Sequence, residues 1–273
     1  MKTSMTKVSL AVAMLAVSSV ATAGIANTKH NFGKSANTGN SGSGWNWTNG
    51  TTEICVFCHT PHGADDSAAA PLWNRSIGTN TYTMYSSLGT STLDATDQQL
   101  NGSGSISLAC LSCHDGTQAM DTMMNTPGGG ADGTLVGTTT AANTGLNGWV
   151  EFQSMSEISA EIIYLGTDLS NDHPVAIQYA GAGGANVDGD FKTAVAGGGS
   201  FYLEGVGADG STVNAAGYDK NDMRLFTASG GALSGQQLVE CATCHDPHSE
   251  NTTFLRNTQG NENSATCLSC HTK

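Results

Sequence analysis

The sequence has few charged residues and very few basic ones. Only 12% of its 273 residues are charged, and ten Lys and Arg stand against 23 Asp and Glu, which gives a formal net charge of −13. Charged residues usually make up about a quarter of a chain. Because so acidic a protein lacks the basic surface that binds phosphates, we expect neither nucleic acid nor anionic lipid as a partner.

Large apolar side chains are also scarce. Aromatic residues make up 6% of the chain, whereas 35 residues are glycine. A small domain is stable only if it buries enough apolar surface, and these residues alone would give a thin core. We therefore expect a bound non-protein group to supply part of the buried apolar mass.

No long hydrophobic run occurs after the first 23 residues. Lys2 and Lys7 precede the mainly apolar residues 8–20, and the small residues 21–23 follow them. This order is typical of a secretory signal peptide, and the apolar run is too short for a membrane span. We expect an exported protein without a membrane span, whose mature chain begins near Gly24.

Cysteine is absent outside one pattern. All eight cysteines lie in four Cys-x-x-Cys-His sequences, numbered here as motifs 1 to 4. Motif 1 is Cys55, Cys58 and His59; motif 2 is Cys110, Cys113 and His114; motif 3 is Cys241, Cys244 and His245; motif 4 is Cys267, Cys270 and His271.

This spacing suits covalent attachment of haem. Two cysteines three positions apart and the next histidine lie on one side of a helical turn. The thiols can therefore bond to the two vinyl groups while the imidazole reaches the iron, as in c-type cytochromes. Disulfides, zinc knuckles and a thioredoxin-like redox motif are the alternatives, but none explains a histidine after every second cysteine. We predict four haems c.

The number of histidines indicates how each iron is completed. The chain has eight histidines, and the four outside the motifs are His30, His62, His173 and His248. One is available for each haem, so the sequence predicts four irons with two imidazole ligands each. Methionine is the alternative sixth ligand, and Met120, Met123 and Met124 follow motif 2. We expect these methionines to pack against the haem instead.

Motifs 1 and 3 continue to a second histidine, as CVFCHTPH and CATCHDPH. Three residues reach at most about 10 Å, and the proline stiffens the path. His62 and His248 therefore cannot reach the far face of the haem that their own motif holds. Each must serve a different haem, so that each of these motifs holds two haems close together.

The order of histidines and motifs repeats along the chain. His30, motif 1 and motif 2 are followed by His173, motif 3 and motif 4, which suggests a duplication. Equivalent modules would pair His62 with motif 2 and His248 with motif 4. His30 would then complete the haem of motif 1, and His173 the haem of motif 3.

The predicted fold is mostly irregular and is built around haem, with short α-helices at the motifs and a few small β-strands. We expect helix within residues 105–114, 235–245 and 264–271, and strands near 176–179, 191–195 and 200–206. Asp188-Gly-Asp190 reads as a turn. The predicted parts are the signal peptide (1–23), an N-terminal di-haem module (24–126), a glycine-rich insert that carries His173 (127–235) and a C-terminal di-haem module (236–273).

The region from residue 241 to residue 271 resembles the doubled Cys-x-x-Cys-His unit of multihaem c-type cytochromes, and CLSCHDGTQA and DHPVAI extend the likeness. The chain is similar to the tetrahaem outer-surface cytochromes of metal-respiring bacteria, of the outer-membrane cytochrome E type. This resemblance implies a polymer with a continuous line of haems, in which one subunit can donate a histidine to its neighbour. By the same resemblance, His30 is the candidate donor.

The predicted function is extracellular electron transfer at the cell surface, without catalysis, between an electron donor and an acceptor. Two alternatives stay open. One is a periplasmic monomer that shuttles electrons through the same four haems. The other is an oxidoreductase with an open haem, which a full set of eight histidine ligands disfavours. A structural glycine-rich surface protein is a third possibility.

Overall fold

The computed structural model describes the parts of the chain that carry all eight cysteines and all eight histidines. The described residues are 24–32, 53–67, 69–89, 96–101, 104–118, 123–125, 164–181, 188–197, 199–203, 221–257 and 261–272. The predicted signal peptide and much of the predicted glycine-rich insert lie outside these ranges.

The helices are short, and those at motifs 2 and 4 lie where the sequence predicts them. The α-helices are α2 (Ser107–His114), α3 (Cys241–Cys244) and α4 (Ala265–Cys270). Motif 1 instead forms the 3-10 helix Cys55–Phe57. Further 3-10 helices are Gly24–Asn27, Tyr85–Leu88, Thr252–Phe254 and Glu262–Ser264.

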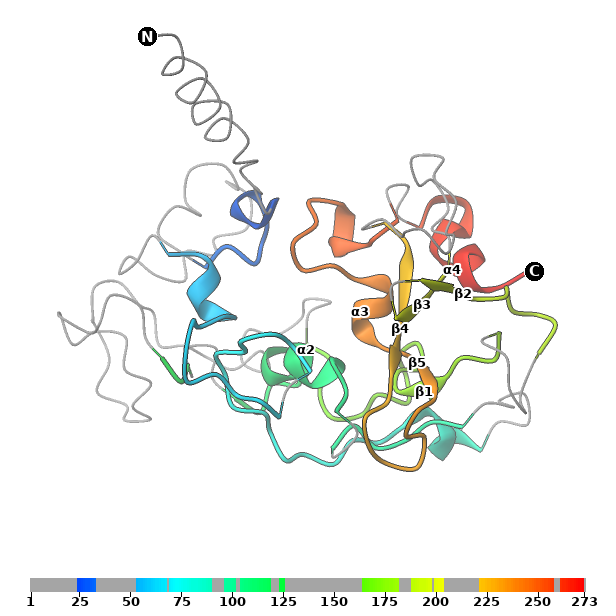
Figure 1. The fold of residues 1–273 in the computed structure, drawn as a ribbon, viewed down its shortest axis with the longest axis horizontal. Coiled ribbons are helices and arrows are strands. Elements are labelled where there is room, and N and C mark those ends of the chain that lie inside the picture. Colours follow the sequence, from blue (N-terminus) through cyan, green and yellow to red (C-terminus); the bar gives the residue numbers. More distant parts are fainter. Residues whose placement is uncertain are drawn as a thin grey trace, which may run out of the picture.

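Five short antiparallel strands form one sheet in the order β1-β5-β4-β3-β2 (Figure 1). The strands are β1 (Ile177–Gln178), β2 (Val195–Gly197), β3 (Ser200–Leu203), β4 (Met223–Thr227) and β5 (Gln237–Val239). The sequence does not predict strand β4. The helix predicted over 235–245 is wrong in its first half, because Leu238 and Val239 pair with Phe226 of β4 and Ile177 of β1.

The sheet supports the last two motifs. The apolar cluster on its strands includes the buried residues Leu203, Met223 and Leu225, and the partly buried cysteines of α3 and α4, Cys244 and Cys270, pack against this cluster. The short strands therefore serve as a platform that brings motifs 3 and 4 together.

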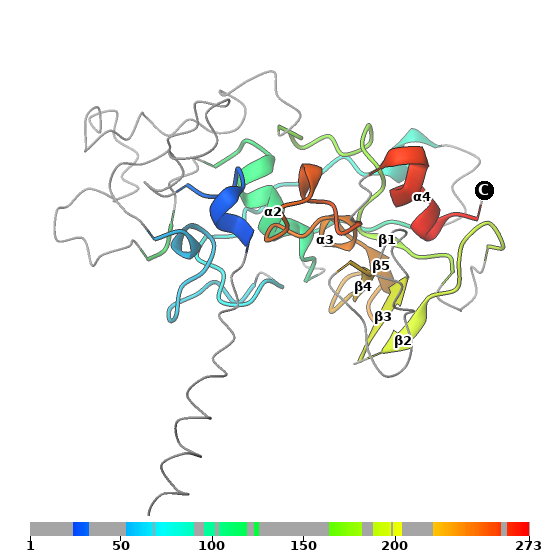
Figure 2. The same ribbon diagram turned by 90° about the horizontal axis from the view of Figure 1, so that it is seen from above.

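A second core lies under α2. Leu108 and Leu111 of this helix are buried with Tyr82, Leu100 and Leu169. Figure 2 shows α2 and α3 near each other, with the sheet beyond them. Motif 2 is therefore held on its own apolar base, next to the platform that carries motif 3.

Replacing Leu111 by Ala should destabilise the protein strongly. Leu111 is 1% exposed, and removing a buried leucine costs about 2–5 kcal/mol because a cavity is left behind. Urea unfolding of the haem-loaded protein measures this loss in the free energy of unfolding. Leu88→Ala is the control, since Leu88 is 51% exposed and its replacement should cost about 0.5 kcal/mol or less. Equal losses in the two variants would contradict the role of this core.

The sheet crosses the predicted boundary at residues 235/236. Strand β5 lies in the predicted C-terminal module, but both of its neighbours, β1 and β4, lie in the predicted insert. The division into modules stays a prediction. Among the described residues, no helix has the length and apolar character needed to cross a bilayer.

Candidate haem-attachment site

Motif 1 is closed by a loop that returns to it. The Nδ1 atom of His59 lies 2.7 Å from the carbonyl oxygen of Pro71. The backbone N–H of Asn74 donates to the carbonyl of Cys58 at 2.9 Å, and the Asn74 side chain donates to the carbonyl of Val56 at 2.6 Å. This loop fixes both the imidazole and the turn that carries the thiols.

Motif 3 repeats the same arrangement with different side chains. The Nδ1 atom of His245 lies 2.8 Å from the carbonyl oxygen of Thr253. The backbone N–H of Arg256 donates to the carbonyl of Cys244 at 2.8 Å, and its Nε–H donates to the carbonyl of Ala242 at 2.9 Å. Arg256 thus stands where the asparagine stands in motif 1. This shared geometry supports the duplication that the order of motifs suggests.

Two pairs of histidines face each other. The ring centres of His59 and His248 lie 6.2 Å apart with nearly parallel planes, at 14°. Those of His30 and His114 also lie 6.2 Å apart, with planes at 67°. An imidazole binds a metal at about 2 Å, so two rings on opposite sides of one iron have centres about 6 Å apart. Both pairs therefore have the separation of ring centres that two imidazole ligands of one haem iron would need.

A third extra histidine, His173, lies near the histidine of motif 4. Burial lowers the pKa of His173, and the nearby His271 of motif 4 lowers it further. His245 and His62 are left over. His245 also lowers the pKa of His30, so it lies near a histidine that already faces His114. Among the described residues, which include every histidine, the exposed His62 ring makes no hydrogen bond and faces no other imidazole.

This arrangement differs from the pairing expected from the sequence. His30 faces motif 2 instead of motif 1, and His248 faces motif 1 instead of motif 4. His173 lies near motif 4 instead of motif 3. The expected pairing assumed two independent modules, whereas the chain folds so that residues of one module lie against motifs of the other.

The cysteines are available for covalent attachment. All eight are free thiols. Burial raises the pKa of Cys58 and Cys270 to about 12 and that of Cys244 to about 11, so these thiols are neutral. A hydrogen bond between the thiols of Cys110 and Cys241 raises the pKa of Cys110 and lowers that of Cys241. Motifs 2 and 3 therefore meet at their first cysteines.

A buried carboxyl group joins motif 2 to motif 3. Glu240 is 1% exposed, and it accepts hydrogen bonds from the hydroxyl groups of Ser105, at 2.7 Å, and Ser107. The Ser107 hydroxyl also accepts from the backbone N–H of Cys241 at 3.0 Å. Burial raises the pKa of Glu240. These bonds fix the start of α3 against the start of α2.

Two of the extra histidines, His30 and His173, are held in a form that can bind iron. Burial lowers the pKa of His30 to about 4, and His114 lowers it as well. The ring is therefore neutral at physiological pH, as a metal ligand must be. Its Nδ1 atom lies 3.4 Å from the carbonyl oxygen of Pro247, and that of His173 lies 3.1 Å from the carbonyl oxygen of Pro174.

Asp246 and Arg256 contact the site, but they were not predicted from the sequence. Asp246 accepts hydrogen bonds from His248, which lowers the pKa of the carboxyl group to about 2. The spacing Asp-Pro-His offered a signal, because an aspartate commonly bonds to the backbone two residues further on.

Two of the three methionines considered as alternative ligands, Met123 and Met124, belong to the described residues. Met123 packs against Phe57, and Met124 is 46% exposed. Met120 lies outside the described residues. Their packing against haem stays a prediction.

Comparison with known families identifies the last two motifs. Residues 234–273 match the family described as the doubled CXXCH motif. The match supports a multihaem c-type cytochrome. The matched motifs indicate covalently bound haem c and a role in electron transfer. No curated protein matches the chain.

Proposed function

We propose that this cytochrome carries electrons outside the cell through four haems c, each held between two histidines, as a subunit of a filament. The two histidine pairs with ring centres 6.2 Å apart are the observation that carries the proposal. Haem supplies the one-electron chemistry, and the protein supplies two imidazoles whose positions need not change between the two oxidation states.

Contacts between the motifs favour a continuous path for electrons. Cys58 of motif 1 packs against the cluster formed by Trp73 and Ala109, and Ala109 belongs to α2 beside motif 2. Cys110 of motif 2 meets Cys241 of motif 3. The second cysteines of motifs 3 and 4 pack against the same core. We infer that the haems follow one another in the order of the motifs.

The filament would need contact between haems of neighbouring subunits. The resemblance to filament cytochromes put His30 forward as the histidine donated to a neighbour. Because His30 faces His114 in its own chain, we propose His62 as the donor and the iron held by His245 as its target. Besides neighbouring subunits, the filament would have two kinds of redox partner, a cellular electron donor and a terminal acceptor.

The variant His62→Gly should abolish filaments and leave the subunit folded. The His62 side chain is exposed and holds nothing in place among the described residues, so its removal should cost about 0.5 kcal/mol or less. Electron microscopy of sheared cell-surface material measures filaments, and EPR should show one high-spin iron in each subunit. His30→Gly is the comparison. Loss of filaments in that variant alone would return the donor role to His30.

A pyridine haemochrome assay together with electron microscopy tests the whole proposal. We expect four haems in each chain and filaments in material sheared from cells. Four haems in a protein that stays monomeric in the periplasm would favour the soluble shuttle. Fewer than four haems in each chain would contradict the proposal that four haems carry the electrons.

One observation favours a second candidate, an oxidoreductase with an open haem. The histidine near His245, His30, already faces His114, so the iron of His245 could keep a free face. Carbon monoxide binding distinguishes the two functions. Assembled protein that binds one carbon monoxide per chain would support the enzyme, whereas the filament proposal predicts no binding.

A further inference from the structure

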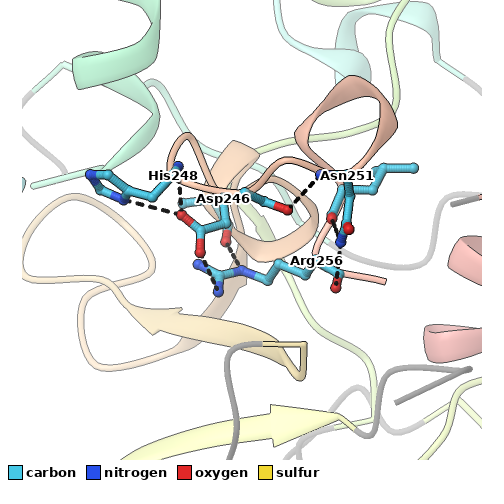
Figure 3. Close-up of polar contacts among 7 residues, drawn as sticks. Asp246, His248, Asn251 and Arg256 are labelled. Carbon is cyan, nitrogen blue, oxygen red and sulfur yellow. Dashed lines mark hydrogen bonds and ion pairs between the residues drawn. The ribbon is translucent and has the colours of Figure 1, made fainter. Parts of the chain in front are cut away.

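Asp246 lies against the ring of one facing histidine. Its Oδ1 atom accepts from the backbone N–H of His248 at 2.9 Å and lies 3.2 Å from the Nδ1 atom of the same residue. Arg256 approaches the other carboxylate oxygen at 4.0 Å. Figure 3 shows the carboxylate between the imidazole and the guanidinium group.

The carboxylate fixes the tautomer of His248. An ionised carboxylate only accepts hydrogen bonds, so Nδ1 must carry the proton and donate it. The lone pair of Nε2 is then available for a metal. The ring also lies in the right place, since it faces His59 across 6.2 Å. Asp246 therefore prepares His248 for the haem that motif 1 holds.

The carboxylate also distinguishes His248 from the histidines whose Nδ1 atom lies near a backbone carbonyl. The Nδ1 atoms of His59 and His245 face backbone carbonyls, of Pro71 and Thr253. A carbonyl carries a partial charge, whereas a carboxylate carries a full one. A hydrogen bond to a carboxylate makes an imidazole a stronger electron donor to its metal. Stronger donation stabilises the oxidised iron.

The corresponding segment that follows motif 1 lacks this carboxylate. Thr60 stands where Asp246 stands, and its hydroxyl group donates to the carbonyl of His62 at 3.0 Å instead of bonding to an imidazole. The two copies share their loop geometry and differ at this position. The difference therefore acts on one haem only.

We propose that Asp246 is a positioning residue that gives the haem between His59 and His248 the lowest reduction potential of the four. The proposal depends on the ligation by two histidines inferred above. An electron on this haem would pass on to motif 2 with a favourable change in potential.

Redox titration of the assembled protein, followed by EPR, tests this role. Asp246→Asn removes the charge, and Asp246→Thr installs the residue that the chain itself uses in motif 1. In either variant we expect the component of lowest potential to become about tenfold easier to reduce, a shift of about 59 mV for one electron. The other three components should keep their potentials. Thr60→Val is the matched control and should leave the lowest component unchanged.

The outcomes distinguish the proposed role of Asp246 from the proposed ligation of the iron by two histidines. Nearly parallel imidazole planes give this haem an EPR signal distinct from that of the His30–His114 pair, which identifies the component that moves. Low-spin iron with unchanged potentials, or a shift in another component, would overturn the role of Asp246 alone. A high-spin iron at motif 1 in the unmodified protein would overturn the ligation itself.

Discussion

Replacing Cys110 and Cys113 together by Ala should remove one of the four haems and stop electron flow along the protein. The two thiols are the attachment points of motif 2, and without them the haem has no covalent bond to the chain. The haemochrome absorbance per chain should fall by about a quarter, since one attachment motif of four is lost. Conduction through the assembled material should fall to background.

The position of motif 2 explains the size of this effect. Cys110 meets Cys241 of motif 3, and Ala109 belongs to the apolar cluster against which Cys58 of motif 1 packs. In the proposed path the haem at motif 2 lies between those of motifs 1 and 3, so its loss would leave a gap. Ser112→Ala is the control within the same motif, since it removes only a hydrogen bond to the carbonyl of Ala109, worth about 1 kcal/mol. A double variant that still conducts would show that electrons take another route.

The variant His248→Gly should open the iron held by motif 1. His248 supplies the ring that faces His59, so its removal should convert one iron per chain from low spin to high spin and let it bind carbon monoxide. Its lost donation should also raise the reduction potential of that haem. EPR and carbon monoxide difference spectra measure the change of spin state and the open face, and a redox titration measures the potential.

Added imidazole provides the control for His248→Gly. The free ligand should enter the space left by the side chain and restore the low-spin signal, which a misfolded protein would not do. A variant that stays low-spin without imidazole would mean that another residue, and not His248, completes this iron.

The covalent attachment of haem could be predicted from the sequence, but which histidines lie close together could not. Four repeats of one motif and eight histidines indicate the cofactor and the ligand count without any fold. Which imidazoles face each other depends on how distant segments meet. His59 and His248 lie near opposite ends of the chain and are brought together only by folding.

The helices at the motifs could be predicted better than the strands, because a strand depends on partners that are distant in the sequence. The helices at motifs 2 and 4 follow from local spacing. Residues 237–239 were expected to continue the helix of motif 3, yet they form β5 because two other strands offer them hydrogen bonds. The partner strand β4 carries no local signal as strong as a motif. Strand pairing of this kind depends on context more than on intrinsic preference.

EPR of the oxidised, assembled protein, integrated against protein concentration, tests the central claim most directly. The claim is that every iron has an imidazole on both faces. The account predicts low-spin ferric signals that amount to four spins per chain and no high-spin signal. A high-spin signal of one spin or more per chain in the assembled protein would contradict it.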